Sequence, residues 1–303
     1  MNISIVTIYE KDHHLGVASL INSAIRVGFR GRVFVFHKGP VPPWRSSLNQ
    51  DTIILADGSV KVVFKELSPN RHLRFHKPFS MLEVLECDSD SDGVIYVDPD
   101  IVFLAPWQFY EEWLQCGVAL CLDKNFAWVH KNHPWRKYWK ALVQRANLPL
   151  KRDTSEYANS GFVGVARPDI LLLKNWIATT LQFEKEGGNT ATGVRPHRTK
   201  PVVGDQDILA ATLHSFPNEP AFIGQEGMGF NGHFFVLAHA VGNPKPWQKS
   251  FVWHALKGKA PHPAERMWLT YADSPIPALS KSRYKLARID FTVGKLISRF
   301  WRR

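Results

Sequence analysis

The first half of the chain alternates short apolar, often β-branched runs with longer segments in which apolar residues recur at helical spacing. The apolar runs predict six strands, at 2–8, 32–37, 52–56, 61–66, 93–97 and 117–122. The helical spacing predicts two helices with three inward apolar residues each: 16–28 with Leu20, Ala24 and Val27, and 76–87 with Phe79, Leu82 and Leu85. Strands that alternate with helices are typical of a parallel α/β sheet, the layout of many nucleotide-binding proteins.

The pattern changes after Asp123, where the alternation gives way to aromatic-rich helices, loops and scattered strands. The apolar run from Phe234 to Leu237 predicts a strand, and the Gly-rich, polar segment 186–204 predicts a mobile loop, either a lid or an ordinary surface connection. Residues 1–8 lack the basic start and long apolar run of a leader. No window approaches the roughly 18 apolar residues of a membrane span. We therefore expect one domain over residues 1–279 and nothing that crosses a bilayer.

Charge and cysteine content narrow the class of protein. The net charge is +11, but 280–303 carries eight basic residues and one acidic residue, which leaves only +4 for the other 279 residues. That remainder is too small for a general polyanion-binding surface, so we expect no nucleic acid partner. The three cysteines, Cys87, Cys116 and Cys121, have no metal-ligand spacing, and we expect reduced thiols and a cytoplasmic protein.

The basic tail, 280–303, has the pattern of an amphipathic helix. Its apolar residues fall on one side of a helical wheel: Leu286, Ile289, Val293, Leu296, Ile297, Phe300 and Trp301. Most of its lysines and arginines fall on the other side. This pattern predicts a helix lying on an anionic membrane, at the inner face of the cytoplasmic membrane. The alternative is a helix docked on the domain's own core, with its basic face in solvent.

Two carboxylates close the apolar run 93–97. The sequence there is Val-Asp-Pro-Asp, and because side chains at i and i+2 of an extended segment point the same way, Asp98 and Asp100 can face one ligand. Two hard oxygen donors suit Mn²⁺ or Mg²⁺, ions that can bridge to a diphosphate. The alternative is a simple Asp-Pro-Asp turn between strands.

A second polar segment, His-Ala-Val-Gly-Asn-Pro-Lys-Pro-Trp, runs from His239 to Trp247. Histidine is a ligand for transition ions, Gly242 allows the backbone to approach a phosphate, and Lys245 supplies a cation for phosphate oxygens. Those three properties fit a metal-bound diphosphate. The alternative is a proline-containing turn with a core histidine and a solvated lysine.

These segments, together with 157–162 (Tyr-Ala-Asn-Ser-Gly-Phe) and 204–209 (Gly-Asp-Gln-Asp-Ile-Leu), resemble in content and order the retaining glycosyltransferase family 8, which includes glycogenin and lipopolysaccharide galactosyl- and glucosyltransferases. The resemblance spans about residues 2 to 250. It implies an A-type glycosyltransferase fold, a mixed nucleotide-binding sheet flanked by helices. It also implies that Asp98, Asp100 and His239 bind Mn²⁺ and that Asp98, Gly242 and Lys245 meet the donor diphosphate.

Further roles follow from the resemblance. Asn159, Asp205 and Gln206 are implied to lie around the donor sugar and the reacting carbon, although Asp205 also fits as the N-cap of a helix over 206–214. Lys77 stands where a basic residue approaches the donor, and a solvated helix start explains it equally well. Thr7 and Tyr9 could contact the donor base, with simple packing as the alternative for Tyr9. The chain departs from the family at Ala210, where Asn is common, and its base-contact region is not a clean match.

The sequence therefore predicts a metal-dependent hexosyltransferase that uses a nucleotide sugar, by resemblance a UDP-sugar, and a glycan or lipid-linked acceptor, with retention, as in lipopolysaccharide biosynthesis. The alternatives are an inverting transferase of similar fold and an inactive nucleotide-sugar or glycan binder. Aromatic faces stack on sugars, and Trp128, Trp135 and Trp139 are acceptor-contact candidates for which core packing is the default.

Overall fold

The chain folds around one twisted eight-stranded sheet. The structure is a computed structural model that describes residues 1–45, 51–68, 70–192, 199–231 and 236–300. The strands of the large sheet follow the order β3-β4-β2-β1-β5-β8-β7-β9, and β10 pairs with β6 in a separate two-stranded ladder. Their bounds are β1 Ile3–Glu10, β2 Gly31–Lys38, β3 Thr52–Leu55, β4 Val60–Glu66, β5 Gly93–Val97, β6 Ile101–Phe103, β7 Ala119–Leu122, β8 Ala158–Ala166, β9 Ala221–Ile223 and β10 Leu237–His239.

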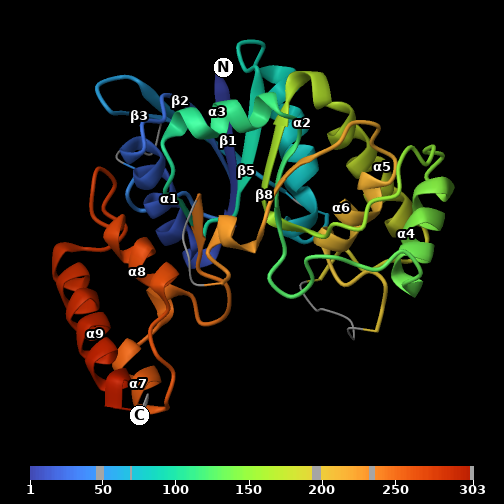
Figure 1. Ribbon diagram of the computed structural model, residues 1–303. Coiled ribbons are helices and arrows are strands. Elements are labelled where there is room, and N and C mark those ends of the chain that lie inside the picture. Colours follow the sequence, from blue (N-terminus) through green and yellow to red (C-terminus); the bar gives the residue numbers. More distant parts are fainter. Residues whose placement is uncertain (46–50, 69, 193–198, 232–235, 301–303) are drawn as a thin grey trace.

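Helices cover both faces of this sheet (Figure 1). Their bounds are α1 His14–Arg26, α2 Lys77–Cys87, α3 Trp107–Gln115, α4 Pro134–Arg145, α5 Leu171–Lys185, α6 Asp205–Leu213, α7 Phe251–Leu256, α8 Pro263–Thr270 and α9 Lys281–Phe300. Alternate residues of each central strand point to opposite faces: Ile5 packs with α1 and α3, whereas Val6 packs with α2 and α6. Because both faces are covered, β1 and β5 read as continuous apolar runs.

The six predicted strands are all present, within one or two residues of their expected bounds. The expected parallel pairing holds for β4, β2, β1 and β5. The sheet is mixed beyond them, since β8 runs antiparallel to both β5 and β7, and β3 runs antiparallel to β4. The first two residues of the predicted strand from Phe234 to Leu237 lie outside the described residues, and Leu237 begins β10. In the loop predicted over 186–204, residues 193–198 are also outside them.

The inward face of α2 differs from the prediction. Phe79 and Leu82 are only partly buried, while Met81, Val84 and Leu85 are fully buried. The helix starts at Lys77, whose side chain is buried. The buried residues recur at three- and four-residue intervals from Lys77 through Ser80 and Met81 to Val84 and Leu85, so Phe79 and Leu82 fall at the edge of the inward face. In the other predicted helix, Leu20 and Ala24 are buried, but Val27 follows the end of α1 and is half-buried.

The C-terminal segment after α8 packs against α1, the first helix of the chain. The Nδ2 of Asn22 in α1 donates hydrogen bonds to the carbonyls of Tyr271 and Ile276, both at 2.7 Å. Phe291 of α9 is buried in the same core cluster as α1 and α3 and packs against Phe251 of α7. Figure 1 shows α7, α8 and α9 side by side at one end of the molecule. Among the residues described, none of the helices has the length and apolarity needed to span a membrane.

Candidate metal and donor site

The turn between β5 and β6 carries Asp98 and Asp100, and backbone hydrogen bonds hold it on three sides. The N–H of Asp98 donates to Gly161 of β8 at 2.8 Å, and the N–H of Ile101 donates back to Asp98 at 3.0 Å. The N–H of Ala240 donates to the carbonyl of Asp100 at 2.9 Å. The antiparallel ladder between β6 and β10 pairs Ile101 with His239. Segments 140 residues apart in sequence therefore meet at one point.

Asp98, Asp100 and His239 form a three-residue cluster there. One possible ligand atom from each lies within 4.8 Å of the others, and no other group of three or more such residues occurs in the described parts of the chain. Asp100 and His239 are buried, and Asp98 is half-buried. Two carboxylates and an imidazole are a donor set that suits Mn²⁺ and accommodates Mg²⁺ less well. The structure thus brings together all three predicted metal ligands.

Gly161 makes room for this cluster. A Cβ atom at Gly161 would lie 2.9 Å from Oδ2 of Asp98 and 3.0 Å from Cε1 of His239. Any larger residue would fill the space between the ligands. The absence of a side chain on this residue therefore fits a small ion held among them.

Asp100 has two basic neighbours. Its Oδ1 lies 3.4 Å from Nε2 of His239, and Lys245 forms an ion pair with its Oδ2. Burial alone would raise the pKa of Asp100, but the charges and hydrogen bonds of His239 and Lys245 outweigh it and hold the pKa well below its usual range. Asp100 therefore stays ionised, as a metal ligand must.

Lys77 joins the metal cluster to the second group of predicted residues. Its buried Nζ lies 3.2 Å from Oδ1 of Asp98 and 3.0 Å from Oδ2 of Asp205, and it donates to the carbonyl of Ser160 at 2.9 Å. Burial opposes the charge of Lys77, but the two carboxylates prevail and raise its pKa. In return Lys77 lowers the pKa of Asp205 against the effect of burial. The sequence indicated a cation near the donor and did not show that it is buried between two carboxylates.

Tyr96 orients Asp98 from the preceding strand. Its hydroxyl donates to Oδ1 of Asp98 at 2.7 Å, the same oxygen that Lys77 contacts. The other oxygen, Oδ2, is the one beside Gly161 and His239. Asp98 thus has one oxygen engaged by the protein and the other turned toward the cluster. Sequence reasoning missed Tyr96, although its position two residues before Asp98 on a buried strand places both on one face.

Asn159, Asp205 and Gln206 meet where β8 approaches the start of α6. The hydroxyl of Ser160 donates to Oδ2 of Asp205 at 2.6 Å, and the N–H of Ser160 donates to Oε1 of Gln206 at 3.3 Å. Asn159 accepts from the N–H of Gly161 at 2.9 Å. These contacts bring the three predicted residues to the same strand end as the metal cluster.

Asp123 is a further polar residue of this region that sequence reasoning missed. It follows β7, is buried, and its Oδ2 accepts from Nδ2 of Asn159 at 2.8 Å. Its position directly after an apolar strand matches that of Asp98 after β5. This shared position at the end of an apolar strand is the sequence signal that could have identified Asp123.

The proposed N-cap role of Asp205 is wrong. Helix α6 begins at Asp205, Gly204 is the N-cap residue, and the carboxylate of Asp207 accepts from the N–H groups of Val203 and Gly204 at 2.7 and 3.0 Å. Asp207 therefore supplies the cap, and the hydroxyl of Tyr157 donates to its other oxygen at 2.5 Å. This arrangement leaves Asp205 turned toward Lys77.

The remaining predicted donor residues differ in exposure. Thr7 and Tyr9 are buried on β1, and the hydroxyl of Tyr9 donates to the carbonyl of Pro40 at 3.1 Å while its ring stacks on His37. Tyr9 is thus packed in the structure. Gly242 is exposed, has a φ of +111° and would have open space around a Cβ.

The three tryptophans predicted as acceptor contacts also differ in exposure. Trp139 is buried and stacks on Tyr157, Trp135 is partly buried, and Trp128 is 64% exposed. Trp128 belongs to the segment that follows Asp123, where it forms a β-bridge with Glu156. Of the three, only Trp128 presents much of its ring to solvent.

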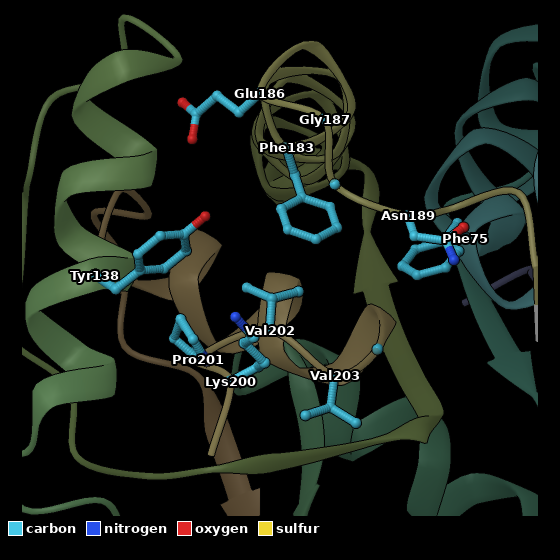
Figure 2. A pocket seen from close by; sticks show the side chains of 12 residues that line it. Phe75, Tyr138, Phe183, Glu186, Gly187, Asn189, Lys200, Pro201, Val202 and Val203 are labelled. Carbon is cyan, nitrogen blue, oxygen red and sulfur yellow. The ribbon is translucent and has the colours of Figure 1, made fainter. Parts of the chain in front are cut away.

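A cavity of about 380 Å³ lies behind the start of α6 (Figure 2). Tyr138 of α4, Phe183 of α5 and residues 200–204 line it, and Tyr138 and Pro201 also line a neighbouring hollow of about 430 Å³. Trp135, one of the acceptor candidates, lines the second hollow, and none of the predicted metal, donor or catalytic residues lines either cavity. The cluster described above therefore lies apart from both cavities.

Comparison with known proteins adds a relationship of fold. No family model and no curated protein matches the chain in sequence. Among solved structures, the chain is similar to LgtC, a family 8 lipooligosaccharide galactosyltransferase whose structure is that of an active-site mutant, with a TM-score of 0.55 and 16% sequence identity. The match covers 93% of this chain and 99% of LgtC. The chain therefore has the A-type glycosyltransferase fold that its sequence motifs predicted.

Proposed function

We propose that this protein is a metal-dependent glycosyltransferase that moves a hexose from a nucleotide sugar, a UDP-sugar, to a glycan or lipid-linked acceptor with retention. The convergence of Asp98, Asp100 and His239 within 4.8 Å carries the proposal. Their place at a strand end of a glycosyltransferase fold supports it, because ligands of open α/β sheets bind where strands end. Mn²⁺ is the ion we propose, since one ligand is an imidazole.

The proposed ion, Lys245 and Gly242 each contribute to binding the donor diphosphate. A bound divalent ion would stabilise the negative charge that develops on the departing diphosphate. Lys245 adds a positive charge beside Asp100, and Gly242 lets the backbone approach a phosphate oxygen closely. Asp100 holds Lys245 in place before the donor binds, so this positive charge is preorganised.

The sugar side of the site is proposed to lie at Asp205, Gln206 and Asn159. Lys77 keeps Asp205 ionised, and Asp205 is the proposed partner for donor hydroxyls beside the anomeric carbon. Retention, the uridine base and an acceptor of the lipopolysaccharide type rest on the resemblance to family 8. The fold shared with LgtC, a lipooligosaccharide galactosyltransferase, supports them.

The test is donor turnover by a panel of nucleotide sugars, measured as release of the nucleoside diphosphate. We expect turnover with Mn²⁺, none with a chelator, and recovery when Mn²⁺ is restored. Asp100→Asn should lose at least about 100-fold in rate, because it removes a ligand charge that stabilises the transition state. The matched control is Asp273→Asn, an exposed carboxylate between α8 and α9, which should retain full activity.

Two outcomes would contradict the proposal. Full activity in chelator would remove the metal from the reaction. Binding of a nucleotide sugar without turnover, under all metals, would favour the inactive binder. NMR of the product from an α-linked donor separates the retaining transferase from the inverting alternative, because only the first gives an α-linked product.

A further inference from the structure

Helix α9 is held to the rest of the protein by one narrow row of residues. Phe291, Gly294 and Ser298, spaced three and four residues apart, are the buried residues of the helix. A Cβ at Gly294 would lie 2.8 Å from the backbone of Phe251, so the glycine permits close contact with α7. Asp290 accepts from the N–H groups of Phe251 and Val252 at 2.6 and 3.1 Å and so caps α7.

A second row, of large apolar residues, stays exposed. It runs along α9 at three- and four-residue intervals: Leu286 is 65% exposed, Ile289 59%, Val293 39%, Leu296 49% and Phe300 80%. On a helical wheel this row is nearly opposite the docked row. The apolar stripe predicted from the sequence is therefore not what attaches the helix to the core. Soluble domains rarely leave such a row in water, and it marks an interaction surface.

A third row, of cations, separates the other two on one side of α9. It consists of Lys281, Lys285, Arg288, Lys295 and Arg299. None of these side chains forms an ion pair with any residue that the structure describes. The only acidic residue of the helix, Asp290, is engaged by the N-terminus of α7. The apolar row is thus bordered by uncompensated positive charge.

The adjoining helix exposes residues of the same kind. Trp253 and Leu256 of α7 are 57% and 51% exposed, and Nζ of Lys257 lies 4.5 Å from the centre of the Trp253 ring. Tryptophan with a neighbouring lysine is typical of the boundary between lipid headgroups and acyl chains. Figure 1 shows α9 beside α7 at the outer edge of the molecule.

We propose that the exposed row of α9, with α7 beside it, docks the protein on an anionic lipid bilayer, at the inner face of the cytoplasmic membrane. The apolar row would lie among the acyl chains and the cationic row would contact the headgroups. Charge complementarity selects this occupant over a second copy of the chain, because two copies joined along this row would bring their cations together. Residues 301–303, which extend the same pattern in the sequence, lie outside the described residues.

The test uses the full chain and two pairs of matched double variants. The first comparison sets the α9 double variant Ile289→Gln/Leu296→Gln beside a control double variant on α5, Leu171→Gln/Leu181→Gln. Both of these leucines are 45% exposed. The second comparison sets the α9 double variant Arg288→Gln/Arg299→Gln beside the α5 double variant Lys174→Gln/Lys185→Gln. All four of these residues are exposed. Truncation is unsuitable, because loss of α9 would uncover Phe251 and remove the buried Phe291.

Binding is measured by co-sedimentation with phosphatidylcholine vesicles, with and without phosphatidylglycerol, over a range of salt. We expect the wild-type protein to bind only the anionic vesicles, with binding weakened by salt. The α9 arginine pair should bind about 30-fold more weakly at low salt, since each cation contributes roughly fivefold. The α9 apolar pair should weaken binding by at least about tenfold. Both α5 pairs should bind like wild type, and all variants should unfold at the wild-type temperature.

Three results would overturn the proposal. One is wild-type binding by the α9 apolar pair, which would reduce the surface to a general polyanion site. The second is equal binding to neutral vesicles. The third is a dimer in sedimentation velocity that the α9 apolar pair dissociates, with no vesicle binding, which would assign the row to a second copy of the chain.

Discussion

The buried ammonium of Lys77 gives the sharpest test of how this site is held together. Replacement by methionine keeps most of the apolar stem and removes the charge between Asp98 and Asp205. Removing one partner of a buried ion pair costs about 3–5 kcal/mol, because the remaining charge stays buried without compensation. A loss of that size is a large fraction of the roughly 5–15 kcal/mol by which domains are stable.

The assay is urea unfolding in the presence of chelator, followed by the fluorescence of the eleven tryptophans. Lys65→Met is the matched control: Lys65 pairs with Glu83 at 2.7 Å, but their side chains are 29% and 44% exposed, so the loss should stay below about 1 kcal/mol. Lys77, by contrast, has a side chain that is 5% exposed.

The pH dependence provides a second reading of the same variant. The folded pKa of Asp205 is lowered, so its contribution to stability is present above its unfolded pKa and is lost as the pH falls through the folded pKa. Without Lys77 that pKa should rise, because burial remains. The deficit of Lys77→Met should therefore be largest at neutral pH and shrink in acid. A deficit below about 1 kcal/mol, or one that is unchanged by pH, would refute the reasoning.

Three other substitutions test neighbouring contacts. Tyr96→Phe should lower the affinity for Mn²⁺ by about tenfold, because it frees the oxygen of Asp98 that Tyr96 holds; unchanged affinity in calorimetry would show that Lys77 suffices. Gly161→Ala should abolish Mn²⁺ binding while circular dichroism stays that of the wild type, since a Cβ would lie 2.9 Å from Asp98; normal binding would speak against the cradle. Gly16→Ala should lower the unfolding temperature by several degrees, because its Cβ would lie 2.2 Å from the carbonyl oxygen of Pro99, and an unchanged temperature would contradict this contact.

The strands, the fold class and the grouping of Asp98, Asp100 and His239 could be predicted because each depends on local pattern or on a motif. The apolar run before Asp98 forms strand β5, and this strand places Asp98 at the site, so one sequence pattern predicts both the strand and the position of the carboxylate. Lys77 is different, because its partners are 21 and 128 residues away and nothing in a helix-start lysine indicates burial. The role of Asp207 was missed because it acts from the third residue of α6, where its carboxylate accepts from the N–H groups that precede the helix, whereas Asp205 fits the preference for an N-cap residue.

The C-terminal helix shows a different limit of sequence reasoning. Periodicity identified the apolar row of α9 and cannot say which row a helix uses for docking. The structure assigns docking to the row that contains Phe291, Gly294 and Ser298, where Gly294 permits close approach to α7. A glycine that weakens the helix as a local element thus improves its packing.

The ladder between β6 and β10 has a consequence for how the protein comes into being. It joins residues 101–103 to residues 237–239, so His239 reaches Asp98 and Asp100 only after most of the chain has been synthesised. Contacts this distant in sequence form slowly, because a long loop must close before they are made. A growing chain can therefore pair the parallel strands β1, β2, β4 and β5 before His239 has been made, whereas the cluster of Asp98, Asp100 and His239 can assemble only after synthesis has passed residue 239.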